Sequence, residues 1–408
     1  MNQDKLPFLP ADILLPRDCA YSKWSVVACD QYTSQPEYWQ RVEERVGSAP
    51  STLRLILPES RLEGPDTQAD ITEINSTMSR YLREGRFQVH PDAVFYIERT
   101  LDGGKVRRGL VGRIDLEQYD YEPGSAAPIR ATEGTVLSRI PPRVAVRKNA
   151  PIELPHVMLL VDDPDKTVIE PLTAAADTME KLYDFDLMQN GGHIRGYKLS
   201  DNQVDAVAKA LEGLASDEAM QKKYGVSGVA PLLFAVGDGN HSLATAKACY
   251  EEQKKGKTPE EYLALPSRFA LVEVVNNHDD ALQFEPIHRV LFGVDHEKFM
   301  KAFQAAYPNA YEGRGEGHTI EFVWNGESHF ITVPDPKVQL AVGTLQGVID
   351  PYLKENGGEV DYIHGDDVTR ELGSKPGNMG FLLPAMGKEQ LFKTVMADGV
   401  LPRKTFSM

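Results

Sequence analysis

The segment from residue 232 to residue 254 constrains the fold of this chain more than any other. It opens with the apolar run Leu232-Leu233-Phe234-Ala235-Val236, passes through Gly237-Asp238-Gly239-Asn240-His241, and ends in an alanine-rich stretch from Ser242 to Lys254. A short apolar run of this kind predicts a buried strand, and the stretch after it predicts a helix. Two glycines allow a sharp turn between them, with Ser242 expected near the helix N-cap. The segment therefore predicts a strand, a turn and a helix of an α/β protein.

The rest of the chain mixes the same two patterns. Apolar runs at 24–29, 93–97, 110–114, 157–161 and 269–275 predict further strands, and residues 36–46, 71–82 and 204–214 have helical spacing. From about residue 296 the pattern resembles a smaller α+β lobe. We expect an α/β (mixed α+β) fold with a central mixed sheet and flanking helices. We expect lobes at residues 1–130, 131–295 and 296–408, with uncertain boundaries and an intertwined path, because no low-complexity linker separates them.

Charge and composition exclude several classes of partner. The formal net charge is -16, so nucleic acid and anionic membranes are not expected as main partners. The N-terminus lacks a signal-peptide pattern, and no apolar run approaches the roughly 18 residues that span a bilayer. Three cysteines without a Cys-x-x-Cys pair predict neither a disulfide framework nor a structural zinc site. We expect a cytoplasmic protein, and the sequence makes no prediction of its oligomeric state.

The turn after Val236 carries the residues best suited to chemistry. The first amides of a helix lack partners within it and lie at the positive end of its dipole, which suits a phosphate or a carboxylate. The turn presents Asp238, Asn240 and His241, which can hold a magnesium ion, accept a proton or donate to a developing oxyanion. Thr245 and Lys247 follow within two helical turns. The alternative is that the glycines and Asn240 merely turn the chain, but ligands favour the carboxyl end of a buried strand.

Two other groups of residues are candidates for binding. Arg139, Arg143 and Arg147 are spaced four apart, and the last two would share a helical face that grips a polyphosphate. Their alternative is a solvated basic face paired with surface acids. His288 and Arg289 precede an apolar run and could contact a substrate carboxylate. A structural salt bridge is the alternative for that pair.

Together with the turn, three segments make the chain recognisable: Val26-Val27-Ala28-Cys29-Asp30, Phe284-Glu285-Pro286-Ile287-His288-Arg289 and Leu401-Pro402-Arg403-Lys404-Thr405-Phe406. In this order they resemble the bacterial family known as domain of unknown function 1015. The turn is also similar to that of the ParB/sulfiredoxin-like superfamily, which includes kinases of free serine. The resemblance implies a ParB/sulfiredoxin-like core plus additional lobes. It also implies that Asp30 is a base or serine-orienting carboxylate, that Gln31 contacts substrate, and that the turn addresses nucleotide phosphates or magnesium.

The turn departs from the related pattern at one position. The pattern reads Asp-Gly-His-His-Arg, whereas this chain has Asn240 and then Ser242 in place of the arginine. Serine cannot replace the charged fork of an arginine. Either Lys247 or an arginine of the 139–147 segment supplies the charge, or this branch does different chemistry.

These residues predict a phosphotransferase acting on a small hydroxylated metabolite. The first expectation is a kinase of free L-serine that gives O-phosphoserine, with ATP or ADP as donor and Mg²⁺ as cofactor. Phosphoryl transfer needs positioning, charge neutralisation and an acceptor-orienting base, which these residues could supply. The rival is a nucleotide-binding regulatory protein that transfers no phosphate. A hydrolase or lyase acting on a phosphorylated metabolite is a third alternative.

Overall fold

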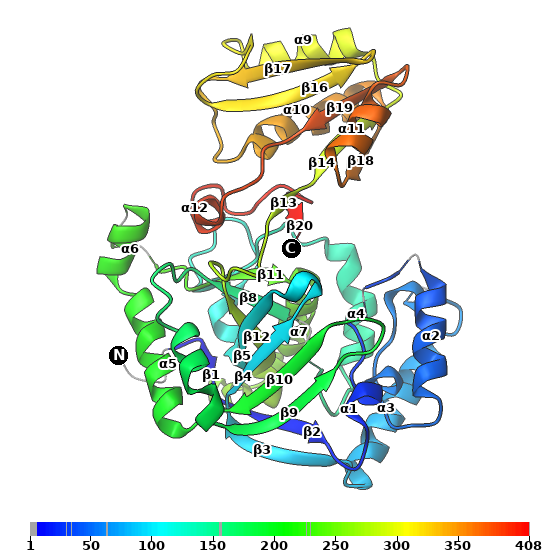
Figure 1. Cartoon of the computed structure of the whole chain (residues 1–408), viewed down its shortest axis with the longest axis vertical. Helices are drawn as coiled ribbons and strands as arrows, with labels where there is room; N and C mark the ends of the chain where they lie inside the picture. Colours follow the sequence, from blue (N-terminus) through cyan, green and yellow to red (C-terminus); the bar gives the residue numbers. More distant parts are fainter. Residues whose placement is uncertain are drawn as a thin grey trace. The chain divides into compact units, whose positions relative to one another are not determined.

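The computed structural model describes residues 6–407, except residues 30, 34, 63, 155, 156, 226 and 229. The chain forms two compact units, labelled by element in Figure 1. Unit 1 contains Met1–Tyr121, Ser125–Ala131 and Thr135–Ala281, and unit 2 contains Leu282–Met408 with two short pieces, Glu122–Gly124 and Thr132–Gly134. Two short pieces of unit 2 thus come from before residue 135, although the rest of the unit begins at Leu282.

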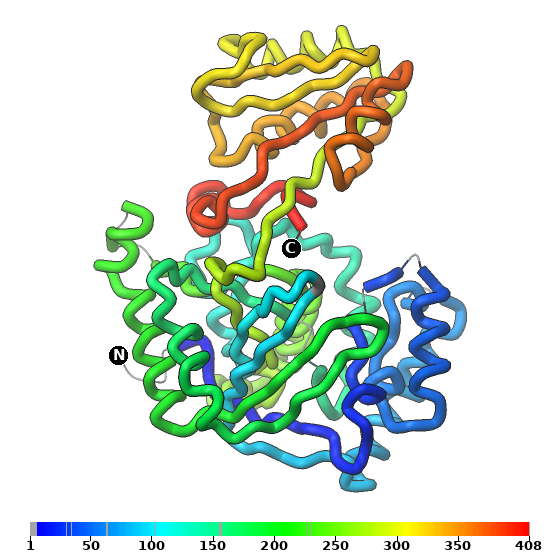
Figure 2. Tube along the Cα trace, in the orientation of Figure 1, coloured from blue at the N-terminus to red at the C-terminus, as the bar shows by residue number. Residues whose placement is uncertain are grey.

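A mixed sheet is the centre of unit 1. Among the described residues it has ten strands, in the order β6-β7-β11-β8-β12-β5-β4-β10-β9, with β1 paired to β5. Their bounds are β6 Tyr119–Asp120, β7 Ile129–Arg130, β11 Phe234–Asp238, β8 Val157–Val161, β12 Phe269–Asn276, β5 Val106–Asp115, β4 Phe95–Thr100, β10 His193–Lys198, β9 Glu180–Asp186 and β1 Phe8–Leu9. Strand β8 runs parallel to β12 and antiparallel to β11. In Figure 2 the green hairpin β9–β10 lies beside β4, to which it is paired although about 100 residues separate them.

Helices and a second, two-stranded sheet cover the two faces of this sheet. Helices α5 (Asp201–Leu214) and α7 (Asn240–Lys254) pack with Leu110, Ile114 and Val236 in the main core. On the other face, β2 (Ala11–Pro16) and β3 (Phe87–Ala93) pack with Phe95 and Ile97. The remaining helices of unit 1 are α1 Tyr21–Trp24, α2 Pro36–Val46, α3 Thr67–Arg83, α4 Ile140–Arg147, α6 Asp217–Tyr224 and α8 Pro259–Leu263.

Unit 2 is an antiparallel sheet with helices. Its strand order is β15-β17-β16-β19-β14-β18, with bounds β15 Tyr311–Glu312, β17 Glu327–Val333, β16 His318–Trp324, β19 Asn378–Leu382, β14 His288–Phe292 and β18 Glu359–Ile363. Its helices are α9 His296–Ala306, α10 Ala341–Asn356, α11 Asp366–Gly373 and α12 Lys388–Asp398. A short pair, β13 (Glu285–Pro286) and β20 (Phe406–Ser407), joins its two ends. Phe299, Phe322 and Phe381 contact one another in its core.

The structure confirms the α/β class with a central mixed sheet and flanking helices. The strand expected at 24–29 is wrong, because residues 25–29 have no strand partner and Val26 and Val27 pack against α2 instead. The Trp24 carbonyl there accepts hydrogen bonds from the hydroxyls of Ser51 and Thr52. No helix in the described part of the chain is long and apolar enough to cross a membrane.

Candidate functional site

A β-bulge forms the end of strand β11. Val236 pairs with Leu159 and Asp238 pairs with Met158, so Gly237 is the extra residue between them. A Cβ atom at Gly237 would lie 2.8 Å from Cγ of Leu160, so the glycine allows β11 to approach β8 closely. Bulges of this kind redirect the side chains that follow them. Here the side chain that follows is Asp238, which is exposed although Val236 is fully buried.

Helix α7 begins at Asn240, directly after the bulge. Gly239 is its N-cap and has a left-handed φ of 87°, which favours glycine. The Gly239 amide donates to Oδ1 of Asp238 at 2.8 Å. The helix was expected to begin at Ser242, but it begins two residues earlier, at Asn240. The left-handed Gly239 is its N-cap, and Ser242 is its third residue. The positive end of the helix dipole therefore lies beside the exposed carboxylate of Asp238.

His241 and Thr245 are tied to their surroundings within unit 1. The Nε2 atom of His241 accepts a hydrogen bond from the backbone amide of Val136 at 3.4 Å. An imidazole that accepts at Nε2 carries its proton at Nδ1, so it can act as a base only by giving up this contact. The Thr245 hydroxyl donates to the His241 carbonyl at 2.7 Å and is buried, which places it inside the helix packing.

Lys247 does not direct its charge to the start of α7. Its Nζ contacts the backbone carbonyl of Leu116 at 2.8 Å and the Glu251 carboxylate at 3.2 Å, one turn further along the helix. Both partners lie away from the turn. The charge that the missing arginine would supply is therefore not replaced by Lys247 in this conformation.

The arginines of the 139–147 segment lie on and before helix α4. Pro141 and Pro142 fall in its first turn, where proline is tolerated, so Arg143 and Arg147 are on one helix as expected. Arg143 pairs with Glu59, and Arg147 pairs with Glu153 at 3.0 Å. Arg139, the N-cap, is exposed.

Helix α4 lies in contact with α7. The segment that contains Asp30 and Gln31 is linked to the same helix, because the Cys29 carbonyl accepts the Glu59 amide at 2.8 Å and Glu59 pairs with Arg143. Gln31 is exposed. Asp30 itself lies outside the described residues.

His288 and Arg289 belong to unit 2, where both are engaged. Nε2 of His288 contacts Asp366 at 2.9 Å, and its Nδ1 accepts the Leu383 amide at 3.1 Å. The Arg289 guanidinium is fully buried and donates to the carbonyls of Arg403 and Lys404. Burial lowers the pKa of Arg289 to about 10. These contacts tie Arg289 to the C-terminal segment and His288 to α11 and to the backbone of Leu383.

Sequence analysis missed a charged cluster on strands β4, β5 and β12. Arg99 on β4 pairs directly with Arg107 on β5, and Arg107 contacts Glu273 on β12 at 3.2 Å. A signal was present in the sequence, because Glu273 interrupts the apolar run Phe269–Val275. A charged side chain in such a run indicates a partner across the sheet.

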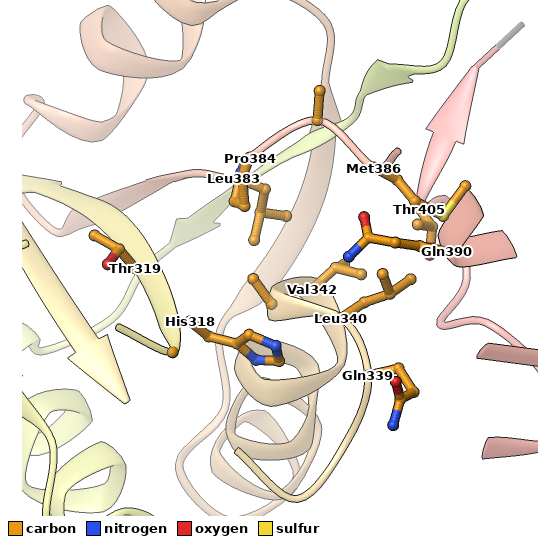
Figure 3. Close-up of a pocket in the computed structure, with 13 residues that line it drawn as sticks. His318, Thr319, Gln339, Leu340, Val342, Leu383, Pro384, Met386, Gln390 and Thr405 are labelled. Carbon is orange, nitrogen blue, oxygen red and sulfur yellow. The ribbon is translucent and has the colours of Figure 1, made fainter. Parts of the chain in front are cut away.

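A cavity of about 280 Å³ lies in unit 2 (Figure 3). Strand β16, the start of α10 and the segment before α12 supply its walls, including His318, Leu340, Met386 and Gln390. His318 contacts the Thr344 hydroxyl at 2.8 Å, and burial lowers its pKa. None of the described residues that line this cavity is Asp, Glu, Lys or Arg, so it does not suit a phosphate or a metal ion.

The side chains at the turn could bind magnesium only together with water and substrate phosphate. In the part of the chain that the structure describes, no three His, Cys, Asp or Glu side chains gather as metal ligands. Mg²⁺ keeps several waters and is commonly bound by one or two carboxylates together with substrate phosphates. Asp238, exposed at the start of α7, suits that mode and not a closed protein cage.

Comparison with solved structures found distant likenesses. A free serine kinase in complex with AMP has 12% identity and a TM-score of 0.37, covering 73% of this chain and 86% of that chain. A conserved hypothetical protein from Pyrococcus furiosus has 13% identity and a TM-score of 0.36, covering 73% and 89%. SbnI with a C-terminal truncation, from Staphylococcus aureus, has 12% identity and a TM-score of 0.36, covering 73% and 82%. At these values the chemistry must be argued from this chain's own residues.

Comparison with sequences gave a family. No curated protein matches the chain. The model described as "Protein of unknown function (DUF1015)" matches residues 13–352, which include the turn at Gly237–Ser242 and the segments around Asp30 and His288. This confirms the resemblance read from those motifs. The chain belongs to the DUF1015 family.

Proposed function

We propose that this protein is a nucleotide-dependent phosphotransferase that acts on a small hydroxylated metabolite. The observation that carries the proposal is the bulged turn, in which a buried strand ends at an exposed Asp238 and the 15-residue helix α7 begins two residues later. The amides and dipole of such a helix start favour phosphate. Free L-serine, giving O-phosphoserine, is the first substrate to test, because the turn resembles that of free-serine kinases.

The residues around the turn have separate roles in this proposal. The turn residues Gly237 and Gly239, together with Asn240 and Ser242 in the first turn of α7, would hold the phosphates of ATP or ADP. Asp238 would hold Mg²⁺ together with phosphate oxygens, and the ion would neutralise charge on the transferring group. His241 lies within the same turn and orients or protonates a phosphate oxygen. Its hydrogen bond from Val136 fixes the ring.

Asp30 is the proposed base for the acceptor. It would take the proton of the acceptor hydroxyl as the new oxygen–phosphorus bond forms and the bond to the nucleotide leaving group breaks. Gln31, the next residue, would contact the acceptor. The carbonyl of the preceding residue is anchored to Glu59, which gives this segment a fixed link to α4.

The proposed site offers little positive charge to bind a phosphate. Arg143 and Arg147 are each paired with a glutamate, so a phosphate must compete with Glu59 or Glu153 for them. Arg139 is exposed, and its guanidinium forms no ion pair with a described residue. We assign the clamp to Arg139 first, because it needs no existing pair to break.

Mass spectrometry of reaction products tests the proposal. Purified protein is incubated with ATP or ADP, Mg²⁺ and a pool of amino acids and hydroxy acids. We expect one phosphoryl group to be gained by serine, and turnover to fall at least about 10²-fold in Asp238→Ala and in His241→Ala. Asp177→Ala, at an exposed aspartate of unit 1, and His364→Ala, at an exposed histidine of unit 2, are matched controls that should keep activity. Full activity in both turn variants would remove the proposed site.

The departure at Ser242 favours a second candidate, a regulatory protein that binds nucleotide without transferring phosphate. Its distinguishing result is a melting temperature raised by ATP or ADP, with no phosphorylated product over hours. Asp238→Ala should abolish that thermal shift. A gain of phosphate on a compound other than serine would instead keep the mechanism and correct the substrate.

A further inference from the structure

Two arginines of unit 1 face each other on neighbouring strands. Arg99 and Arg107 are direct partners in the antiparallel pair β4–β5, so their side chains leave the sheet on the same face. Like charges directly opposite one another destabilise a pair of strands. The proximity is visible in the pKa of Arg99, which is lowered first by burial and then by the charge of Arg107.

Of the two arginines, only Arg107 forms an ion pair with a described residue. Glu273 reaches Arg107 at 3.2 Å because Gly109 leaves room for it; a Cβ at Gly109 would lie 2.5 Å from Oε1 of Glu273. Arg99 has no ion pair with any described residue, and its one hydrogen bond goes to the Gly191 carbonyl at 3.1 Å. Among Arg99, Arg107 and Glu273, two positive charges therefore stand against one negative charge.

The arginines also have unused donors. The Nε atoms of both Arg99 and Arg107 are buried and donate to no acceptor among the described residues. The Arg107 side chain is only 14% exposed. Buried charges in proteins are normally paired, because an uncompensated one loses its hydration without return. An anion bound here would accept from both donors and compensate the second positive charge.

An aromatic pair lies near Arg99. The rings of Tyr32 and Tyr38 stack at 3.7 Å with an interplanar angle of 9°. Tyr38 packs with Met188, three residues before Gly191, whose carbonyl accepts the hydrogen bond from Arg99. Tyr38 is buried on α2, whereas Tyr32 is 40% exposed and forms the outer ring of the stack.

We propose that Arg99 and Arg107 bind a phosphoryl group, and that the Glu273 carboxylate competes with this group for Arg107. A tetrahedral oxyanion can accept hydrogen bonds from two guanidinium groups at once. It would compensate both positive charges and give an acceptor to N–H groups that have none among the described residues. The site belongs to the same sheet as the turn at Gly237–Ser242, because Asp238 on β11 and Glu273 on β12 both pair with Met158 on β8. Phosphate binding by the two arginines stands whether or not that turn transfers phosphate. The phosphoryl group belongs to a nucleotide or to a smaller phosphate ester, and the exposed ring of Tyr32 is where a nucleotide base would stack.

Titration with inorganic phosphate, followed by calorimetry, tests the site on the full chain. Arg99→Gln and Arg107→Gln should each weaken one binding event at least about 10-fold, the scale of a lost charge-assisted hydrogen bond. Glu273→Gln should strengthen it, because the competing carboxylate is removed. The matched control is Arg113→Gln, which lies on the same face of β5, also has a buried Nε without an acceptor, and stacks on the Phe269 ring at 4.2 Å. It should leave phosphate binding unchanged.

Folding does not confound this test. Arg99→Gln relieves the repulsion and breaks no ion pair with a described residue, so it should melt no lower than the parent in phosphate-free buffer. Arg107→Gln also leaves Glu273 without its partner, so the double variant Arg107→Gln/Glu273→Gln is its stability control. Glu273→Gln alone reports on the site in the opposite direction. The proposal is overturned when the parent binds no phosphate, or when all phosphate binding survives in both arginine variants.

A second titration, with AMP, identifies the source of the phosphoryl group. A loss of AMP affinity in Tyr32→Ala, with inorganic phosphate unaffected, supports a nucleotide at this site. Equal affinities of the parent and Tyr32→Ala for both probes support a smaller phosphate ester on the same two arginines.

Discussion

Gly237→Ala is the substitution whose effect follows most directly from the geometry of the site. A Cβ at this position would lie 2.8 Å from Cγ of Leu160, whereas ordinary contacts begin near 3.4 Å. The overlap of roughly 0.6 Å must be absorbed by Leu160, which is fully buried, or by the bulge itself. Overpacking of this kind costs about 1–3 kcal/mol. At about 2–4 °C per kcal/mol for a unit of this size, the melting temperature should fall by several degrees.

The assay must report on unit 1 alone. Trp24 and Trp39 lie in unit 1 and Trp324 lies in unit 2, so urea unfolding followed by tryptophan fluorescence in a Trp324→Phe background isolates the relevant transition. Phosphoryl transfer or nucleotide binding is then measured on the folded variant. We expect the loss of function to exceed the loss of folded protein, because the bulge that directs Asp238 has to shift.

Gly213→Ala is the control for this experiment. Gly213 lies in helix α5 of the same unit, and a Cβ there would meet nothing within 4 Å. Alanine in an exposed helix should raise stability by about 0.5–1 kcal/mol. A Gly237→Ala variant as stable as the parent, or a Gly213→Ala variant destabilised as strongly, would refute the reasoning about the close approach of β11 and β8.

Two further predictions concern buried carboxylates of unit 1. Burial opposes ionisation of Asp162, but hydrogen bonds from His278 and Tyr224 outweigh it and lower its pKa, so its contribution to folding is present above about pH 4 and lost as the pH falls through the lowered pKa. Asp162→Asn should therefore destabilise the protein at pH 7, and the difference should shrink on acidification; a constant difference from pH 7 to pH 3 would contradict this. Arg268 holds the buried Asp115 through two contacts of 2.9 and 2.5 Å, so Arg268→Met should cost about 3–5 kcal/mol in urea unfolding. Adding Asp115→Asn should recover part of that loss, and no recovery would refute the buried-charge explanation.

The turn shows which structural features a local sequence pattern can predict. The strand, the two-glycine turn and the helix of residues 232–254 were predicted from spacing alone, because each signal lies within a few neighbouring residues. The start of the helix was misplaced by two residues. Spacing does not reveal that Gly239 takes a left-handed φ and already caps the helix.

The candidate site could be predicted only where its members are neighbours in sequence. Gly237 to Ser242 lie together because they are consecutive. The partners of Lys247, Arg143 and Arg147 were not foreseen, since the contacts to Leu116, Glu59 and Glu153 depend on how helices pack. The strand expected at 24–29 failed for the same kind of reason, because an apolar run becomes a strand only where another strand offers hydrogen bonds.

The sequence by itself determined the α/β class, the strand–turn–helix at the proposed active site and the family, because periodicity, turn residues and motif order are properties of the chain. Tertiary structure decided which charges meet. Arg99, Arg107 and Glu273 come from strands whose neighbours are fixed by sheet register, and a shift of one residue would send each side chain to the opposite face. Register depends on the packing of the whole unit, and no local pattern around residue 99 or residue 273 contains it.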